Sequence, residues 1–223
     1  MSRKAVAALG VLLAYPRRER FAADLARAEG RLLEAGAAEA SEALEAFERV
    51  AVRRSFDELE ELYTRTFDLT PSCAPFLSVH LFGQESFRRA RLMTGLEEAY
   101  RKAGFDRGTE LPDHVAVVLQ AAESFPEAEW AELVERVLAR PLARMKGALD
   151  ARNPYRHLVE AVRRVLGVAE VPEEASSQPH WRRNAASKPS PHPDPLPSRE
   201  GRGHHHPTLT DEPSKERGPG GDQ

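Results

Sequence analysis

The stretch Pro112-Asp113-His114-Val115-Ala116-Val117-Val118-Leu119 gives the clearest indication of the fold class. As a helix, residues 115–119 would be apolar on every side, and such a helix is stable only where other elements surround it. Pro112 suits the start of a helix, because the N–H that proline lacks has no partner in the first helical turn. We therefore expect a helix buried in the middle of a bundle.

Up to Gly167, apolar residues recur at helical spacing, and no segment shows the alternation of a strand. Capping boxes, in which a serine and a glutamate three residues later bond each other's backbone N–H groups, are predicted at Ser55–Glu58 and Ser124–Glu127. Pro141 is expected to kink or break its helix, and Asn153 to begin the last one. The helix expected over 85–103 has as inward residues Phe87, Leu92, Leu96, Ala99 and Tyr100. The predicted fold is all-α, a single globular bundle of about seven to nine helices.

The C-terminal part of the chain, residues 173–223, differs in composition from the rest. It holds 9 of the 17 prolines, 5 of the 8 histidines and only six hydrophobic residues. So little apolar surface cannot offset the backbone entropy lost on folding, which is roughly 1–2 kcal/mol per residue. We therefore expect one all-helical domain over residues 1–172 and a disordered tail rich in proline, histidine and glycine over 173–223.

Charge and cysteine content exclude several classes of protein. The chain has 32 Lys and Arg against 35 Asp and Glu, without the basic excess of a dedicated nucleic-acid-binding protein. A single cysteine, Cys73, excludes an internal disulfide framework and a cysteine-based zinc site. No apolar run reaches the roughly 18 residues that span a bilayer. The apolar start runs into Pro16 and a basic stretch, so we interpret it as a first helix of a cytoplasmic protein and not as a secretory signal.

The sequence offers no convincing reaction centre. It has no glycine-rich phosphate loop, no closely spaced histidine or Glu-x-x-His pair in the predicted domain, and no nucleophile elbow. Cys73 and His80 lie seven residues apart, but this spacing favours a small buried hydrophobe over a Cys–His dyad. His204-His205-His206 can ligate a transition metal, although composition alone explains three adjacent histidines. We therefore predict no catalytic residue, no cofactor and no metal.

Acidic side chains gather where the apolar helix begins, in Glu110-Leu111-Pro112-Asp113-His114. One interpretation is structural: Asp113 complements the helix dipole, an effect of about 0.3–1 kcal/mol, and His114 bonds a neighbour. The other is functional: carboxylates beside an apolar groove hold a guest whose basic residues precede an apolar helix. The pattern of residues alone leaves both interpretations open.

Several motifs occur in an order that is typical of one family. Leu62-Tyr63-Thr64-Arg65-Thr66-Phe67-Asp68-Leu69 is followed by His80-Leu81-Phe82-Gly83 and Arg88-Arg89-Ala90-Arg91, and then by Glu97–Phe105 and Glu110–Leu119. With these motifs the chain resembles, over residues 5–165, the nitrate reductase molybdenum-cofactor assembly chaperones (NarJ). This family belongs to the wider TorD/DmsD group of redox-enzyme maturation chaperones.

The resemblance implies a dedicated cytoplasmic chaperone without enzymatic turnover. Its partner would be the apo catalytic subunit of a membrane-bound nitrate reductase, bound together with its N-terminal leader region. The chaperone would hold that subunit competent for molybdenum-cofactor and iron–sulfur insertion before membrane assembly. It would bind no nucleic acid, would not insert into the membrane, and would be a monomer or weak dimer. The nearest alternative is a chaperone for another molybdoenzyme of the dimethyl-sulfoxide-reductase family, and a more distant one is a helical enzyme or regulator that shares only the architecture.

The resemblance also implies where the guest binds. Carried over by position, Glu110, Asp113 and His114 would be polar contacts near the guest-binding groove. The apolar or aromatic wall of this groove would consist of Tyr63, Phe67 and Phe76. For these three aromatic residues the alternative is an ordinary place in the core, because they also fit the helical spacing of core residues.

Overall fold

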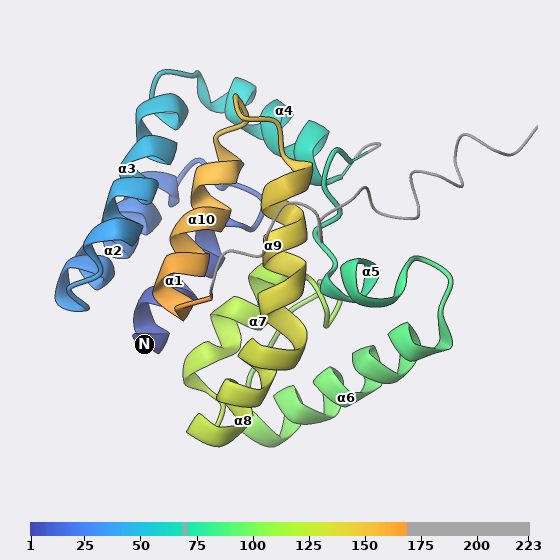
Figure 1. The fold of residues 1–223 in the computed structure, drawn as a ribbon. Coiled ribbons are helices and arrows are strands. Elements are labelled where there is room, and N and C mark those ends of the chain that lie inside the picture. Colours follow the sequence, from blue (N-terminus) through green and yellow to red (C-terminus); the bar gives the residue numbers. More distant parts are fainter. Residues whose placement is uncertain (69–70, 169–223) are drawn as a thin grey trace, which may run out of the picture. The chain divides into compact units, whose positions relative to one another are not determined.

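The structure, a computed structural model, describes residues 1–68 and 71–168, and every regular element in these ranges is helical (Figure 1). The α-helices are α1 (Arg3–Leu12), α2 (Phe21–Glu34), α3 (Ala38–Ala51), α4 (Phe56–Phe67), α5 (Leu77–Phe82), α6 (Phe87–Ala103), α7 (Val115–Gln120), α8 (Glu127–Leu133), α9 (Ala139–Ala148) and α10 (Tyr155–Leu166). A 3₁₀ segment, η1 (Ala121–Glu123), extends α7, and a π-helical segment, η2 (Val134–Leu138), joins α8 to α9. With such runs counted once, the described residues form nine helices, which confirms the predicted all-α fold. The tail predicted over 173–223 lies outside the described residues.

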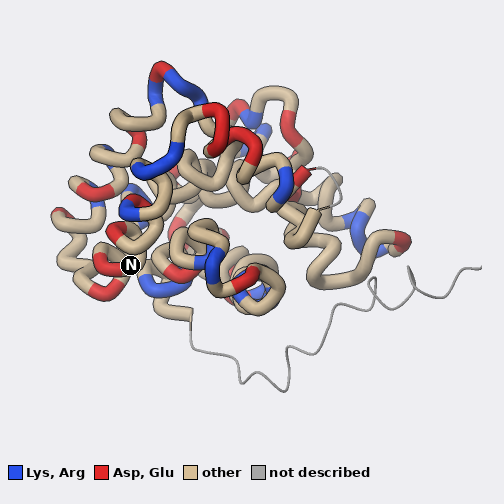
Figure 2. The backbone as a smooth tube through the Cα atoms, turned by 90° about the horizontal axis from the view of Figure 1, so that it is seen from above, with Lys and Arg blue, Asp and Glu red and all other residues tan. Residues whose placement is uncertain are grey.

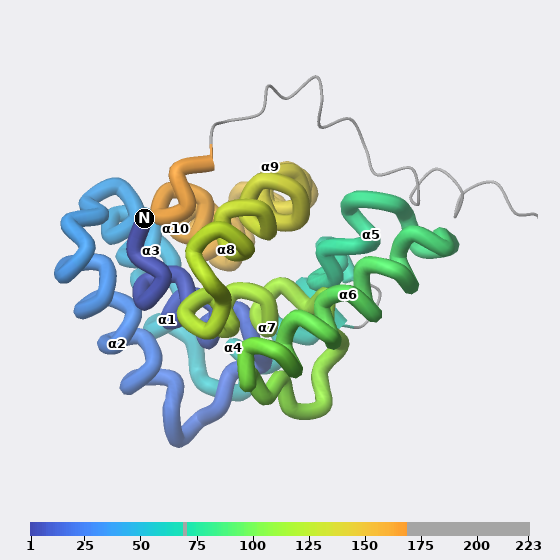
Figure 3. Tube along the Cα trace, turned by 90° about the horizontal axis from the view of Figure 1, so that it is seen from below, coloured from blue at the N-terminus to red at the C-terminus, as the bar shows by residue number. Residues whose placement is uncertain are grey.

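The helix predicted to be central, α7, is surrounded by other helices (Figure 3). Residues 115–119 are each at most 5% exposed. Gly10 of α1 packs directly against α7, because a Cβ at Gly10 would lie only 2.7 Å from the Leu119 Cβ and 3.0 Å from the Gln120 N. The missing side chain at Gly10 therefore sets how closely α1 and α7 approach.

A network of charged side chains joins α10 to the helices beside it. The carboxylate of Glu160 pairs with Lys146 of α9 at 2.8 Å, and it accepts hydrogen bonds from Arg163 at 2.9 Å and Arg164 at 2.7 Å. Arg164 also donates to Glu39 of α3 at 2.6 Å. Burial alone would raise the pKa of Glu160, but hydrogen bonds from Lys146 and Arg164 outweigh it and lower the pKa to about 2.

Two of the three predicted helix caps form in the structure. At Ser55 both bonds of the capping box form, because Ser55 Oγ accepts from the Glu58 N–H and Glu58 accepts from the Ser55 N–H at 2.7 Å. Asn153 also caps as predicted, since its Oδ1 accepts from the Tyr155 N–H at 3.0 Å. The capping box at Ser124 is wrong: Ser124 has helical backbone angles and ends η1, and α8 begins after Pro126 without a side-chain cap.

The irregularity predicted near Pro141 occurs one turn earlier. Pro141 lies in the first turn of α9, and the π-helical segment η2 ends directly before that helix. Proline has no N–H to bond the carbonyl four residues back, and π-helical turns absorb such local mismatches in a helix. The run from α8 to α9 is therefore distorted at η2 and not interrupted at Pro141 itself.

The N-terminal half of α6 is more exposed than its apolar spacing predicts. Only Leu96 and Tyr100 of this helix are fully buried, and both lie in its C-terminal half. Phe87, predicted to face inward, is 81% exposed. In Figures 1 and 3, α6 lies at the opposite end of the described helices from α2 and α3. Phe87 is the first residue of α6 and therefore lies at the exposed start of this helix.

Charges of both signs are interspersed along the described helices (Figure 2). Along the described backbone in this view, Lys and Arg positions are mixed with Asp and Glu positions, unlike the clustered basic residues of a nucleic-acid-binding protein. No helix in this part of the chain has the length and apolarity needed to cross a membrane.

Candidate functional site

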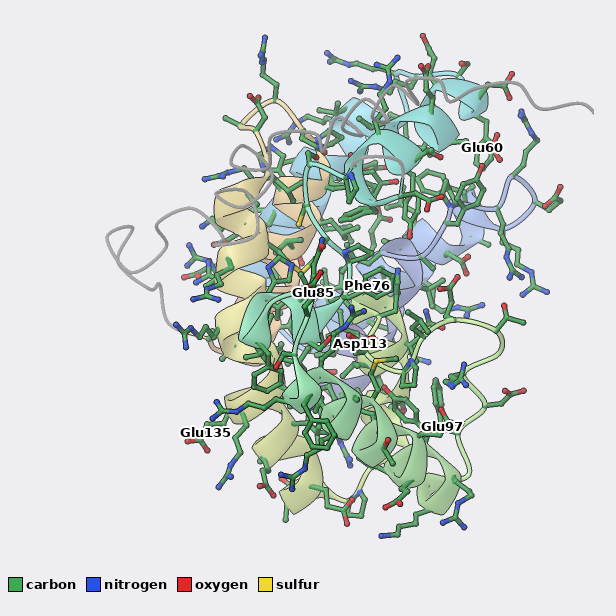
Figure 4. All side chains as sticks on the ribbon, turned by 90° about the vertical axis from the view of Figure 1, so that its right-hand side faces the viewer. Glu60, Phe76, Glu85, Glu97, Asp113 and Glu135 are labelled. Carbon is green, nitrogen blue, oxygen red and sulfur yellow. The ribbon has the colours of Figure 1, made fainter. Side chains whose placement is uncertain are left out.

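Two segments far apart in the sequence meet at the predicted site. The Leu77 N–H donates to the Asp113 carbonyl at 2.9 Å. Beside this bond, Phe76 and His114 form an isolated antiparallel bridge, and their rings lie edge to face with centroids 5.8 Å apart. The segment before α5 and the turn before α7 thus form one unit, and Figure 4 shows Phe76 and Asp113 at the centre of this side of the molecule.

Asp113 forms the buried base of this unit and is 0% exposed. Its Oδ2 accepts a hydrogen bond from Ser78, and the Nε of Arg89 lies 4.0 Å from the same oxygen. Arg89 in turn donates to Ser78 Oγ at 2.8 Å, and its guanidinium lies over the Phe76 ring, 5.7 Å from the centroid. Asp113 therefore positions Arg89, which covers Phe76, and is not itself at the surface.

A pocket of about 660 Å³ is lined by Phe76 and His114 and by parts of α4 and α6. Its aromatic wall consists of Tyr15, Tyr63, Phe67 and Phe76. Its charged lining residues are Asp68, Glu85, Arg89 and Glu110. We call this the acidic pocket, because its lining has three exposed carboxylates and one guanidinium, and the guanidinium is already bonded to Ser78.

Two of the predicted aromatic residues belong to both the pocket wall and the core. Tyr63 and Phe67 are 6% and 4% exposed, and each also lines the acidic pocket. The Tyr63 ring contacts those of Tyr15, Phe67 and Tyr155 at centroid distances of 5.3, 5.1 and 5.8 Å. Tyr155 continues inward to Phe47 at 5.5 Å. Hence a continuous row of rings runs from the pocket into the core.

A second pocket, of about 580 Å³, shares the residues Tyr15, Tyr63, Glu110 and His114 with the acidic pocket. It extends along the end of α1 and the start of α2. Its charged lining residues are Arg17, Arg20, Asp24, Arg27, Arg107 and Glu110. We call it the basic pocket, because four of these six side chains carry a positive charge.

His114 lies at the boundary of the two pockets and is uncharged near neutral pH. Burial lowers the pKa of His114, and this effect exceeds the opposing influence of the carboxylates of Glu110 and Asp113. The Nδ1 of His114 accepts a hydrogen bond from the Ala116 N–H at 3.2 Å. Since Nδ1 is an acceptor, the neutral ring carries its proton on Nε2, which makes that nitrogen a donor.

Comparison with protein families adds the decisive observation. The family model described as "Nitrate reductase delta subunit" matches residues 33–158, more than half of the chain. The chain belongs to this family. Searches of curated proteins and of solved structures gave no match.

Membership of the nitrate reductase delta subunit family confirms the resemblance that the motifs indicate. The family supports a role in nitrate reductase maturation and not in catalysis. It also implies interaction with the catalytic subunit of a nitrate reductase.

Within this delta-family chain, the predicted site residues fall into two groups. Those that line the acidic pocket are Tyr63, Phe67, Phe76, Glu110 and His114. Asp113 is different, because it is buried and, through Ser78, holds the Arg89 guanidinium that lies over Phe76. A guest in the pocket would therefore meet Arg89 and not Asp113.

Two residues of the site were not predicted. Tyr15 is 49% exposed and lines both pockets, and Arg89 lies over Phe76. Arg89 belongs to the motif Arg88–Arg91 that resembles the family, whereas Tyr15 ends the apolar start of the chain. An exposed tyrosine directly before Pro16 was the available signal. Its proximity to Tyr63 depends on a tertiary contact, in which the Tyr63 hydroxyl donates to the Leu13 carbonyl at 3.4 Å.

The other candidate pair among the described residues, Cys73 and His80, is buried. Cys73 and His80 are 0% and 2% exposed, and His80 Nε2 lies 2.7 Å from the Ala74 carbonyl oxygen. Burial lowers the pKa of His80, so this histidine is neutral. Among the described residues, no group of three or more His, Cys, Asp or Glu side chains is placed to hold a metal. The histidines 204–206 lie outside the described residues.

Proposed function

We propose that this chain is a cytoplasmic chaperone for the apo catalytic subunit of a respiratory nitrate reductase. It binds that subunit, including its N-terminal leader region, and holds it competent for molybdenum-cofactor and iron–sulfur insertion before membrane assembly. The family membership supports the class of client. The observation that carries the binding role is the acidic pocket, where an aromatic wall and exposed carboxylates meet on one surface.

The pocket has the chemistry to recognise a segment with an apolar face and basic residues. Apolar side chains gain about 25 cal/mol for each Å² that they bury, and Tyr15 and Phe76, the two rings of the wall that are not buried in the core, offer such a surface. Glu110 and Asp68 are exposed and take part in no ion pair among the described residues, so they are available to a guest's guanidinium or ammonium groups. The aromatic wall then supplies most of the affinity, and the carboxylates determine where along the groove the basic residues of the guest lie.

No nucleotide or catalytic step is needed for such a chaperone. A protein that binds the open, cofactor-free client stabilises that state by RT ln(1 + [L]/Kd). Cofactor insertion closes the client and removes the state that the chaperone prefers, so the equilibrium shifts to release. The chaperone thereby delays closure until the metal centres are in place.

The test is calorimetric titration of the full chain with the purified apo catalytic subunit and with its leader peptide. We expect Phe76→Ala and Glu110→Gln each to weaken binding about five- to tenfold, which corresponds to about 1–1.4 kcal/mol. Matched controls are Phe87→Ala and Glu135→Gln, which change exposed residues outside both pockets. Figure 4 shows Glu135 well away from Phe76.

Two results would contradict this function. Equal affinities for the pocket variants and their controls would exclude the acidic pocket as the binding site. Tighter binding of the apo catalytic subunit of a dimethyl-sulfoxide-reductase relative than of the nitrate reductase subunit would assign the chaperone to another client.

A further inference from the structure

We infer that the two pockets form one bipolar groove, in which the basic pocket holds acidic residues of the same client segment whose basic residues face the acidic pocket. This inference rests on the proposed function and extends it to the chemistry and orientation of the client segment. The segment would carry basic residues at one end, an apolar middle and acidic residues at the other end.

The positive charges of the basic pocket are available for a ligand. Arg17, Arg20 and Arg27 are exposed, and none of them takes part in an ion pair among the described residues. They are balanced in the pocket lining by Asp24 and by the shared Glu110. Three guanidinium groups near the start of α2 therefore lack a counter-charge of equal size.

Two neighbouring arginines, in contrast, form ion pairs within the protein. Arg18 pairs with Asp57 and lies over the Phe56 ring, 4.7 Å from its centroid. Arg107 pairs with Glu97 at 2.6 Å and donates to the Glu110 carbonyl, which holds the loop between α6 and α7. In contrast to Arg18 and Arg107, the side chains of Arg17, Arg20 and Arg27 form no ion pair among the described residues.

The acidic pocket has the opposite arrangement. Asp68, Glu85 and Glu110 are exposed and form no ion pair within the described part of the chain. Its one cation, Arg89, is held by Ser78 and lies close to Asp113. The free charge of this half of the groove is therefore negative, and Figure 4 shows Glu85 beside Phe76 on this rim.

The boundary between the two halves suits an apolar residue. Tyr15 and Tyr63 line both pockets, with ring centroids 5.3 Å apart, and His114 is neutral. Partial burial and the carboxylates of Glu60 and Asp68 raise the pKa of Tyr15, so its ring also stays neutral. A guest that occupies both pockets thus passes over these uncharged rings, which lie between the negatively charged and the positively charged half of the groove.

Opposite charges at the two ends give the groove a direction. Charge-assisted hydrogen bonds are roughly twice as strong as neutral ones, and like charges in contact disfavour the reversed orientation. The Debye length at physiological salt is about 8 Å, so each half of the groove acts mainly on its own end of the guest. A segment with opposite ends is therefore held in one orientation.

Three synthetic peptides test the inference against the full chain. They share one apolar helix-forming middle and differ at their ends, with lysines at one end and glutamates at the other, lysines at both ends, or glutamates at both ends. We expect the peptide with opposite ends to bind about tenfold more tightly than either of the others, which corresponds to about 1.4 kcal/mol.

A charge reversal in the basic pocket tests the assignment of each end. In Arg20→Glu with Arg27→Glu, the peptide with opposite ends should lose about tenfold in affinity, and the peptide with lysines at both ends should gain a similar factor. This rescue cannot arise from a general loss of structure. The matched control is Arg53→Glu with Arg140→Glu, which makes the same change in net charge at exposed sites outside both pockets.

The outcomes separate this inference from the proposed function. If wild-type protein binds neither the apo catalytic subunit nor any peptide, both fail. If it binds the subunit but ignores the charges of the peptide ends, or if the pocket variant behaves like the control, only the inference fails. Displacement of the peptide by millimolar inorganic phosphate at constant ionic strength would assign the basic pocket to small anions and would also overturn it.

Discussion

At the scale of single residues, the position of Asp113 could be predicted from the sequence, but its burial could not. The pattern placed a carboxylate beside the most apolar helix, and this placement is right. It could not show that Asp113 faces inward, because Ser78 and Arg89 come from segments that precede it by 35 and 24 positions. Glu110, three residues earlier, has no such partner and remains at the surface.

Replacement of Asp113 by alanine should therefore destabilise the fold. It would leave the Ser78 hydroxyl without its acceptor and the partly buried Arg89 guanidinium without its nearby counter-charge, a loss of about 2–4 kcal/mol. Thermal denaturation should show a Tm lower by about 5–15 °C for a domain of this size. Glu135→Ala, at an exposed position, is the control and should stay within about 0.5 kcal/mol of wild type. A Tm equal to that of the control would show that Asp113 does not support this unit.

At the scale of helices, local signals predicted most starts and spacings, while contacts between helices decided the exceptions. Ser55 caps α4 because its own box is complete within four residues. Ser124 caps no helix because it lies with helical backbone angles directly after η1, and Pro126 precedes the next helix. Phe87 fits the apolar spacing of α6 but has nothing to pack against, which periodicity within one helix cannot reveal.

Gly10 offers a matched test of helix packing. Alanine generally stabilises a helix by about 1 kcal/mol relative to glycine. At Gly10 the added methyl would overlap Leu119, so we expect Gly10→Ala to destabilise the protein by about 1–3 kcal/mol in urea denaturation. Gly30 in α2 has open space around its Cβ position, so Gly30→Ala should be neutral or stabilising. Equal effects at the two glycines would rule out a close contact between α1 and α7.

At the scale of the whole molecule, the fold class, the family and most of one pocket were predictable, whereas the second pocket was not. Periodicity reports which side of a helix is buried, and motif order reports the family. The basic pocket needs α1, α2, α7 and the loop before α7 to meet, and no single motif describes that meeting. Arg17 and Arg20 indicated in the sequence only the end of an apolar run.

The ion pairs of Glu160 with Lys146, Arg163 and Arg164 should make the stability of the folded chain depend on pH. The pKa of Glu160 is about 2 when folded, below its ordinary value of 4.5, so the network stabilises the fold above about pH 4.5. This contribution is lost as pH falls from there towards 2. We expect Glu160→Gln to reduce the free energy of unfolding by about 1–2 kcal/mol at pH 7 and by less at pH 3.

Urea denaturation of wild type and Glu160→Gln at both pH values measures this difference. Comparison of the two proteins at each pH is needed, because burial also lowers the pKa values of His80 and His114, and their protonation destabilises the fold in acid. A difference between the two proteins that stays constant from pH 7 to pH 3 would show that Glu160 is not held as a charged group.

The two ends of the groove come from different stretches of the chain. Arg17, Arg20 and Arg27 precede the part that the family model matches, whereas Asp68, Glu85 and Glu110 lie inside it. Substitutions near the start of α2 can thus alter the charge of the basic pocket without changing the helices that position the acidic pocket. Evolution, or a protein engineer, has in that short stretch an independent means of changing which immature enzyme is accepted.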